Sequence, residues 1–589
     1  MARPDPHSVT DDTQPVTRRL ELDAVVDFAA RRLGCTTTLH FEAPTPDAGP
    51  LDLDTRGLEV TAATDLTGQA LRWELLTPDA ILGTPLRLHL PKGASGVRLE
   101  SRTAPDASAL QWLEPSQTHG GQRPYLFSQC QAIHARSVLP CQDTPARRVS
   151  YRASLTVPSK LVAVMAAAPL RHEAKGERTT FHFEMPQPIP PYLLAFAVGD
   201  LASRDLSPRS RVWSEPGLLE QSAWEFADVE RHLTAAEALF GPYDWERFDL
   251  LVMPPSFPYG GMENPRLTFL TPTLLAGDRS LVNVVAHELA HSWTGNLVTN
   301  LNAEHFWLNE GFTVYAERRI LEALEGADLA ALHAALGRND LDAAVTRFMA
   351  AGTPALTKLR TQLAGVDPDE AFSVVPYEKG ALLLKALEVA AGREAFDRLL
   401  KSWLGTHRFG SVTTDDFLAH FSKAAPGLLE RVRALEWIDG PGVPSDAPRP
   451  TSRRLEAVKA LAGTVPTAEA TKGWTALDWQ LFLEWSPHTL SARELETLDE
   501  RFGFSRSTNA EVHVGWLLLA LQCGFDEVLP QVEAFVLRVG RMKYLKPLYT
   551  ALQRKPATRA LATKLFEQSR PRLHPIARAV IAGLLAKPR

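Results

Sequence analysis

The chain has 589 residues, of which 45% are hydrophobic and 22% charged, and its formal net charge is −6. It is too long for one hydrophobic core, so we expect about three domains. The slight negative charge, without any basic run, excludes the electrostatic footprint of a protein that binds nucleic acid or a membrane surface.

The ends and the cysteines of the chain bear on its compartment. The first residues, from Met1 to Pro6, lack the apolar core of a signal peptide, and no apolar run reaches the roughly 18 residues that span a bilayer. The four cysteines are scattered: Cys35, Cys130, Cys141 and Cys523. We therefore expect a cytoplasmic protein with reduced thiols and no obligate protein partner.

Residues 1–200 are predicted to form an all-β domain that frames a cleft. Segments 86–90 and 181–185 alternate apolar and polar residues, and Pro, Gly and Asp separate such segments. One stretch, residues 128–134 with Gln129 and Gln131, is too polar for a plain strand. An exposed loop explains these glutamines as well as a binding role does.

From residue 201 to 438 the pattern changes to a mixed helical domain. Residues 224–240 have the spacing of an amphipathic helix, and residues 248–253 are predicted to form a short buried strand. Then comes the pair His287 and His291 with Glu288 between them. On a helix the second histidine lies about 40° around and about 6 Å along from the first, so all three side chains leave one face.

Two neutral imidazoles at this spacing can hold one tetrahedral Zn²⁺, and Glu288 beside the metal suits a general base. Glu310, on a second predicted helix of residues 307–324, would be the third ligand. Two histidines and a glutamate leave one position open, as a catalytic zinc requires. Helix caps at Asp278 or Ser280 and an end at Gly295 fit the first helix. The plain alternative is two core histidines and a surface glutamate.

Two further patterns lie in this domain. Gly260 and Gly261 let a backbone approach a ligand closely, and Glu263 follows them. Taken alone, paired glycines beside proline are more often a turn. Tyr377 stands beside Pro376, and an isolated tyrosine of this kind is usually part of the core or the surface.

Residues 439–452 form a predicted linker rich in proline and glycine, and residues 453–589 are predicted to be α-helical throughout. Successive helical patterns occupy residues 511–521, 526–539, 558–568 and 576–585. Stacked helical pairs of this kind make a rigid curved wall. No exact repeat defines a solenoid period.

Longer stretches carry a resemblance to a known family. The zinc set and residues 124–145, 254–265, 291–300, 307–315, 373–380 and 540–548 resemble the gluzincin zinc aminopeptidases, in particular leukotriene-A4 hydrolase and its aminopeptidase relatives. The resemblance extends over all three predicted regions. It implies a multidomain α+β fold with an N-terminal β saddle domain, a thermolysin-like zinc catalytic domain and a C-terminal helical domain of armadillo/HEAT-like type.

The resemblance also implies roles for matched residues. Glu263 with Gln131, and Gln129 beside them, would bind the free α-amine of a short peptide, and Gly260 and Gly261 would line its backbone. Tyr377 would stabilise the oxyanion, while Arg541 and Lys543 would receive a carboxylate. Without the resemblance, Arg541 and Lys543 fit a solvated helix end. Asp369 matches an aspartate that holds basic side chains and opens lipid epoxides in that family, although taken alone it would fit a turn.

Two positions depart from the pattern of leukotriene-A4 hydrolase. Phe372 stands where that enzyme has a tyrosine, and Phe312 stands where it has a histidine. Phe372 removes a hydroxyl from the neighbourhood in which a lipid epoxide would react.

The sequence therefore predicts an aminopeptidase with one Zn²⁺ per chain that acts on short peptides. The alternatives are a bifunctional peptidase and lipid epoxide hydrolase, a metal-free binding scaffold, and an endopeptidase. The intact zinc set is evidence against the scaffold. Glu263 is evidence against an endopeptidase, because a buried carboxylate favours only the binding of a substrate that brings a positive charge to it.

Overall fold

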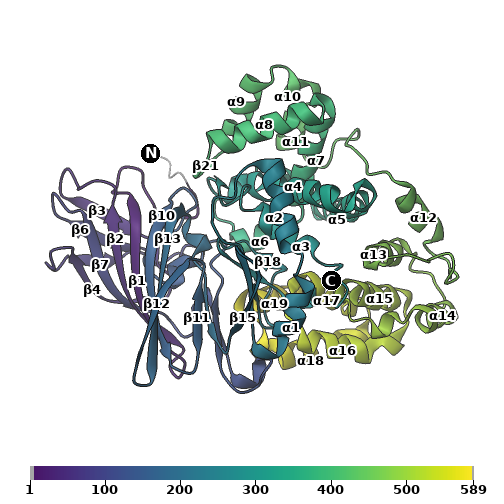
Figure 1. The fold of residues 1–589 in the computed structure, drawn as a ribbon, viewed down its shortest axis with the longest axis horizontal. Coiled ribbons are helices and arrows are strands. Elements are labelled where there is room, and N and C mark those ends of the chain that lie inside the picture. The colour runs from purple at the N-terminus through teal and green to yellow at the C-terminus, as the bar shows by residue number, and fades with distance from the viewer. Residues whose placement is uncertain (1–4, 587–589) are drawn as a thin grey trace.

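The computed structural model describes residues 5–586. Figure 1 shows the β-strands of the first third of the chain on one side and the helices of the middle third beside them. The helices of the last third of the chain lie below and beyond. The predicted order of a β region, a mixed region with the paired histidines, and a helical region is confirmed.

The N-terminal region consists of three sheets around one core. The largest sheet has seven strands in the order β12-β13-β10-β1-β2-β7-β4, with β1 parallel to β10 at its centre. The strands are β1 Thr17–Asp27, β2 Arg32–Phe41, β3 Gly49–Leu53, β4 Glu59–Asp65, β5 Trp73–Leu75, β6 Leu86–Leu90, β7 Gly96–Arg102, β8 Leu110–Leu113, β9 Tyr125–Ser128, β10 Val149–Pro158, β11 Val162–Met165, β12 Ala168–Lys175, β13 Arg178–Ile189 and β14 Phe196–Gly199.

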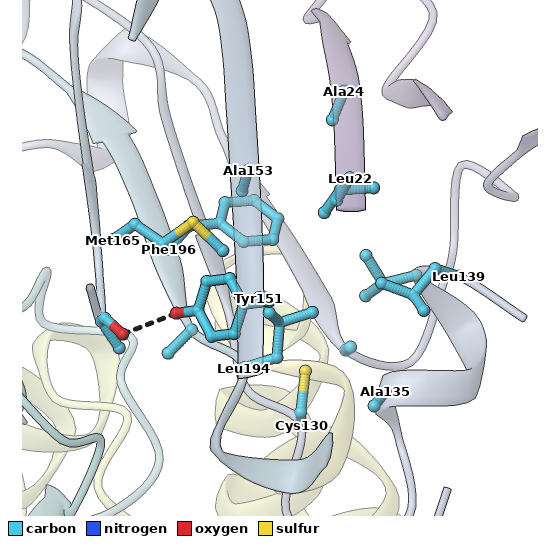
Figure 2. Packing of buried hydrophobic residues seen from close by; sticks show 14 of the residues in the cluster. Leu22, Ala24, Cys130, Ala135, Leu139, Tyr151, Ala153, Met165, Leu194 and Phe196 are labelled. Atoms are coloured by element: carbon cyan, nitrogen blue, oxygen red, sulfur yellow. Dashed lines mark hydrogen bonds between the residues drawn. The ribbon is translucent and has the colours of Figure 1, made fainter. Parts of the chain in front are cut away.

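Residues 129–134 of the polar stretch form a loop after β9, as the loop alternative predicted. They are not exposed, because each of them is buried or half-buried. Figure 2 shows Cys130, Ala135 and Leu139 of this segment among side chains of β1 and β10. At the same place the Tyr151 hydroxyl donates a hydrogen bond to the carbonyl of Ala166. The segment that carries Gln131 is thus anchored to the β core by apolar side chains.

A five-stranded sheet begins the middle region, in the order β15-β16-β17-β19-β18. Its strands are β15 Ala202–Ser207, β16 Ser210–Ser214, β17 Asp249–Val252, β18 Gly261–Met262 and β19 Leu267–Leu270, and β20 Val298–Asn300 pairs with β21 Gly410–Val412. The short β18 is an edge strand, so one side of its backbone has no partner within the sheet.

Helices fill the rest of the middle region. They are α1 Leu219–Glu225, α2 Val229–Phe240, α3 Asn283–Ala290, α4 Trp307–Glu325, α5 Ala327–Ala350, α6 Pro368–Ala371, α7 Val375–Ala391, α8 Arg393–Thr406, α9 Thr414–Ala424, α10 Leu428–Arg431 and α11 Ala434–Asp439. Gly311 of α4 and Gly380 of α7 lie so close that a Cβ at Gly311 would be 2.7 Å from Cα of Gly380. This close packing fixes α4 against α7.

Residues 440–452 contain no helix or strand, and helices follow to the end of the described chain. These are α12 Arg453–Leu461, α13 Ala476–Trp485, α14 Ala492–Phe502, α15 Ala510–Cys523, α16 Leu529–Arg538, α17 Met542–Leu552, α18 Pro556–Ser569 and α19 Pro575–Ala586. Within residues 5–586, none of the helices has the length and apolar character that a membrane span requires.

Some predicted limits were wrong. The helix of the paired histidines starts at Asn283 after Val282, whose side chain makes no capping bond, and it ends at Ala290, well before Gly295. Asp278 instead binds Ser280 in a turn upstream. The predicted single helix of residues 224–240 is two helices, α1 and α2. The domain limits at residues 200, 438 and 452 stay predictions.

Candidate functional site

Helices α3 and α4 bring His287, His291 and Glu310 together. His287 lies in the last turn of α3 and His291 is the residue that caps it. The two Nε2 atoms lie 3.2 Å apart. They lie 3.4 and 3.5 Å from Oε2 of Glu310. Three donor atoms thus converge on one point.

The hydrogen bonds on the far side of each ring determine which nitrogen carries the proton. Nδ1 of His287 faces Oε2 of Glu317 at 3.0 Å, and Nδ1 of His291 faces the carbonyl of Thr294 at 3.0 Å. Both partners are acceptors, so each neutral ring carries its proton on Nδ1. The two Nε2 lone pairs then point at each other, an arrangement that a cation between them stabilises.

The arrangement fits zinc in size as well. Ligand atoms at about 2.0–2.2 Å from a tetrahedral Zn²⁺ are roughly 3.3–3.6 Å apart, which is close to the separations of these three atoms. Oε2 of Glu310 is buried and has no hydrogen-bond partner among the described residues. Such an atom is costly unless a cation meets it. His291 also belongs to a second possible ligand group with Glu263 and Glu288.

Glu288 lies beside this centre under the glycine pair. A Cβ built at Gly261 would be 2.2 Å from Oε1 of Glu288. Burial raises the pKa of Glu288 to about 8, with His287 and Arg541 opposing the rise and Glu310 and Glu317 adding to it. A divalent cation at the centre would favour the ionised form.

Glu263 directly follows β18 and is only 4% exposed. It lines the same cavity as the histidines. Burial and the negative charges of Glu310 and Glu288 raise its pKa well above the usual range. Nε2 of Gln131 lies 3.5 Å from its Oε1. Gln129 is different, because its Nε2 contacts the sulfur of Met262 at 3.1 Å and it does not line the cavity.

Tyr377 lies in the first turn of helix α7 and stacks on the ring of His287, with centroids 6.2 Å apart and planes 17° apart. It lines the same cavity as Glu288. Burial, the charge of Glu310 and a hydrogen bond to that carboxylate raise the pKa of the phenol well above its usual range. The hydroxyl therefore stays protonated and can donate.

Arg541 and Lys543 reach the cavity from the C-terminal region. The NH1 atom of Arg541 donates to Tyr544 at 2.8 Å and to Thr273 at 3.2 Å, whereas its buried Nε has no partner in the described chain. Lys543 is half exposed and pairs with Glu511 at 2.8 Å. NH1 of Arg541 also lies 3.6 Å from Oε1 of Glu511, the carboxylate that Lys543 contacts. Arg541 is thus a buried guanidinium whose Nε has no partner within residues 5–586, and the prediction of a solvated helix end is wrong for it.

Asp369 and Phe372 lie where the main cavity joins an apolar side pocket, and both line the two spaces. Oδ2 of Asp369 contacts Nε2 of His134 at 2.8 Å. Phe372 is 44% exposed. Phe312 is buried between Trp307 and Trp403 and does not line the cavity, so its difference from the family pattern concerns packing.

The cavity has a volume of about 630 Å³, within the usual range for ligand sites. Its walls come from the loop after β9, β18, α3, α4, α5, α7 and the helices α13, α15, α17 and α19. The structure brings together all predicted site residues except Gln129.

Sequence reasoning missed the residues that orient the histidines. Glu317 holds His287, and Thr294 and Thr313 hold His291. Glu317 lies seven residues after Glu310, two turns along the same helix face, so helical spacing was a usable signal. Thr294 binds through its backbone carbonyl, for which a sequence gives no signal.

Comparisons with known proteins agree with this geometry. Residues 224–437 match the Peptidase family M1 domain, residues 106–193 the Peptidase M1 N-terminal domain, and residues 474–585 the leukotriene A4 hydrolase C-terminal domain. The chain is 39% identical to leukotriene A-4 hydrolase of Xenopus laevis and 36% identical to leucine aminopeptidase 2 of Chaetomium globosum. Each alignment covers 98% of both chains.

Two solved structures are similar to different extents. Yeast LTA4 hydrolase in complex with bestatin superposes with a TM-score of 0.92 at 32% identity, covering 99% of this chain and 97% of that chain. An M1 zinc metallopeptidase from Deinococcus radiodurans has a TM-score of 0.59 at 24% identity, covering 74% of this chain and 96% of that chain. The second likeness concerns the fold alone.

Proposed function

This chain belongs to peptidase family M1 and is a zinc-dependent aminopeptidase, and from that premise we propose that it removes single residues from the N-termini of short peptides. His287, His291 and Glu310 hold the one Zn²⁺ in this proposal. When bound there, Zn²⁺ would supply Lewis-acid chemistry, which polarises a scissile carbonyl and lowers the pKa of water.

Glu288 is the general base in this proposal. Its carboxylate lies beside the three ligands and under Gly261, on the wall along which a peptide would lie. It takes a proton from the attacking water and then gives it to the nitrogen of the leaving amine. Tyr377 donates a hydrogen bond to the oxygen on which negative charge develops, a contribution of about 3 kcal/mol if it resembles other oxyanion donors.

Glu263 and Gln131 select the free amino terminus. Glu263 is a buried carboxylate with no ion pair among the described residues, and it faces the cavity. An incoming α-ammonium would meet it, whereas an amide would leave a buried carboxylate without a cation. The unpaired edge of β18 beside it can accept an extended peptide backbone.

Arg541 sets the length of the peptide in this proposal. A Cβ at Gly260 would lie 2.7 Å from NH2 of Arg541, so the guanidinium lies over Gly260, three residues before Glu263. Extended backbone rises about 3.3 Å per residue, so those two positions are at most about 10 Å apart. A tripeptide has a similar span from its amine to its carboxylate. Lys543 adds positive charge at the same end.

The observation that carries this proposal is the convergence of two Nε2 lone pairs and a partnerless carboxylate oxygen in the cavity that also holds Glu263. The test is turnover of a panel of fluorogenic aminoacyl amides, with and without a chelator, and metal analysis. We expect one zinc per chain and a loss of activity that zinc restores. Activity that survives removal of all metal would refute it.

A lipid epoxide hydrolase activity is the second candidate. It is favoured by the relative named leukotriene A-4 hydrolase and by the apolar side pocket that ends at Asp369. Phe372 lines that pocket without a hydroxyl. We therefore expect little diol product from a lipid epoxide, and Phe372→Tyr to increase it. A cytoplasmic location stays a prediction, for which cell fractionation is the test.

A further inference from the structure

Asn296 follows the helix of the paired histidines and contacts three different parts of the fold. Its backbone N–H donates to the carbonyl of His291 at 2.9 Å. Its own carbonyl accepts at 2.6 Å from Arg148, which directly precedes β10 of the N-terminal region. Its side-chain Nδ2 donates to the backbone carbonyl of Glu263 at 2.7 Å. Asn296 is 1% exposed. It is therefore a buried junction between the proposed zinc ligands, the N-terminal sheets and the proposed amine anchor.

The carbonyl that Asn296 holds lies on the open edge of β18. Thr271 donates its N–H to the carbonyl of Gly260 at 3.0 Å, and β18 pairs with β19 in an antiparallel register. Because carbonyls alternate in direction along an extended chain, those of Gly261 and Glu263 point away from β19. The carbonyl of Gly261 thus faces the edge on which a peptide backbone would pair, whereas that of Glu263 is already bonded to Asn296.

The distance from Glu263 to the metal centre decides which peptide bond can reach the zinc. Glu263, Glu288 and His291 each have a ligand atom within 4.8 Å of those of the other two. Within one amino acid the amine nitrogen and the carbonyl carbon are roughly 2.5 Å apart, and each further residue adds about 3.3–3.6 Å. The first residue of a peptide therefore fits between the carboxylate and the metal, and a dipeptide unit does not.

We propose that Asn296 is a positioning residue that sets this register. By taking the carbonyl of Glu263, it closes the open edge of β18 at that point and holds the Glu263 backbone at a fixed distance from His291. A peptide that pairs along the edge must then end at Glu263 with its free amine. The inference rests on the proposed aminopeptidase function and adds the residue that places its amine anchor.

The surroundings of the amide explain why its loss would move Glu263. The carbonyl of Glu263 has no other hydrogen-bond donor among the described residues. Without Asn296 a buried acceptor would be left unsatisfied, so this segment should shift until it finds another donor. Oδ1 of Asn296 is itself buried without a partner in the part of the chain that the structure describes. Stability alone would therefore favour an apolar side chain at this position.

The test compares two hydroxamates that bind to each zinc-loaded protein. Leucine hydroxamate carries the α-amine, and 4-methylpentanoyl hydroxamate is the same molecule without it. Both bind Zn²⁺ through the hydroxamate, so damage to the metal centre cancels in the ratio of their dissociation constants, which calorimetry measures. In the wild type we expect the amine to tighten binding by about 100-fold, and Glu263→Ala should bring the ratio close to one.

Two variants remove the bond from Asn296 to Glu263. Asn296→Leu keeps the branching of the side chain and removes the donor, and Asn296→Ser has a donor that ends one bond short of the carbonyl. In both we expect the advantage of the amine to fall by about 5- to 10-fold at unchanged zinc content, because the bond fixes a charged group. Asn300→Ser is the matched control and should leave the ratio unchanged. Asn300 is a buried residue of the same segment whose Nδ2 donates at 2.8 Å to the carbonyl of Asn302.

An unchanged ratio in folded Asn296→Leu, or in Asn296→Ser should the leucine variant not fold, would overturn the inference. An equal fall in Asn300→Ser would do the same, because the effect would then belong to the folding of the segment. In both cases a large ratio in the wild type leaves the proposed function standing. A ratio near one in the wild type would instead refute the amine anchor of the proposed function, and this inference with it.

Discussion

Gly261 lies so close to Glu288 that a Cβ atom on the glycine would stand 2.2 Å from Oε1 of the carboxylate. The neighbouring Gly260 has the same relation to Arg541, with 2.7 Å to NH2. Neither glycine has a positive φ, so close approach explains both. The glycine pair makes room for the proposed base and for the proposed carboxylate receptor.

Gly261→Ala should therefore lower kcat while leaving the zinc content at one per chain. The methyl group displaces Glu288, and a small misplacement of a catalytic group costs rate. Gly405→Ala, where nothing lies within 4 Å of the added atom, is the matched control. Kinetics and metal analysis on both proteins check the prediction. Normal kcat in Gly261→Ala would show that Glu288 tolerates the displacement and weaken its role as base.

Glu288→Gln should retain zinc and lose activity by about 100-fold or more, the usual contribution of a general base. The amide keeps the size of the side chain but cannot take the proton. Glu310→Gln is the informative comparison, because it should lose metal affinity as well. Loss of zinc from Glu288→Gln would mean that this residue is a ligand, as in the second ligand group with Glu263 and His291.

Arg541→Ala should lower kcat/KM for a tripeptide by an amount equivalent to about 2–4 kcal/mol, which is within the range for truncating one partner of a buried charge pair. The same change should matter little for an aminoacyl anilide, which has no carboxylate. Lys543→Ala should cost about 1 kcal/mol or less, because Lys543 is half exposed and already paired with Glu511. Equal losses on both substrates would give Arg541 a structural role instead.

The stability of the protein should depend on pH through Lys379. This fully buried lysine donates to the carbonyls of Thr357 and Gly440, both at 2.8 Å. Burial, with the charge of Lys358, lowers its pKa to about 7. Between about pH 7 and pH 10 the lysine is protonated in the unfolded chain but largely neutral in the folded protein. The free energy of unfolding therefore rises with pH in this window, and Lys379 adds no pH dependence below about pH 7, where both states bind the proton.

Melting temperatures of the wild type and Lys379→Met at pH 7 and pH 9 test this. We expect the wild type to gain relative to the variant at pH 9, since other titrating groups are common to both proteins. Lys385→Met, a partly exposed lysine paired with Glu388, is the control and should run parallel to the wild type. A constant difference between wild type and Lys379→Met would contradict the low pKa.

Much of the fold was predictable because helical and strand periods are strong in this sequence. Segments 86–90 and 307–324 match β6 and α4 almost to the residue. The end of α3 was not predictable, because the chain turns at His291 so that its ring can face Thr294. A capping pattern carries no information about that tertiary constraint.

The site was predictable where spacing alone determines geometry, as for His287, His291 and Glu288 on one helix. Glu263, Tyr377 and Arg541 lie on three different elements, so only the resemblance could group them. Helix α17 was obscured by Pro547 within it. The burial of Gln129 against Met262 depends on how β9 packs beside β18, which no local pattern describes.

The most direct test of the account compares one tripeptide with its N-acetylated form on the zinc-loaded wild type and on Glu263→Ala. We predict rapid release of the first residue from the free tripeptide and at least about 100-fold slower cleavage of the blocked one, because the acetyl amide leaves the buried Glu263 without a cation. Glu263→Ala should raise KM and lower kcat for the free peptide. The difference in cleavage rate between the free and the N-acetylated peptide should therefore be smaller in this variant than in the wild type. Equal cleavage of the free and blocked peptides by the wild type would contradict it.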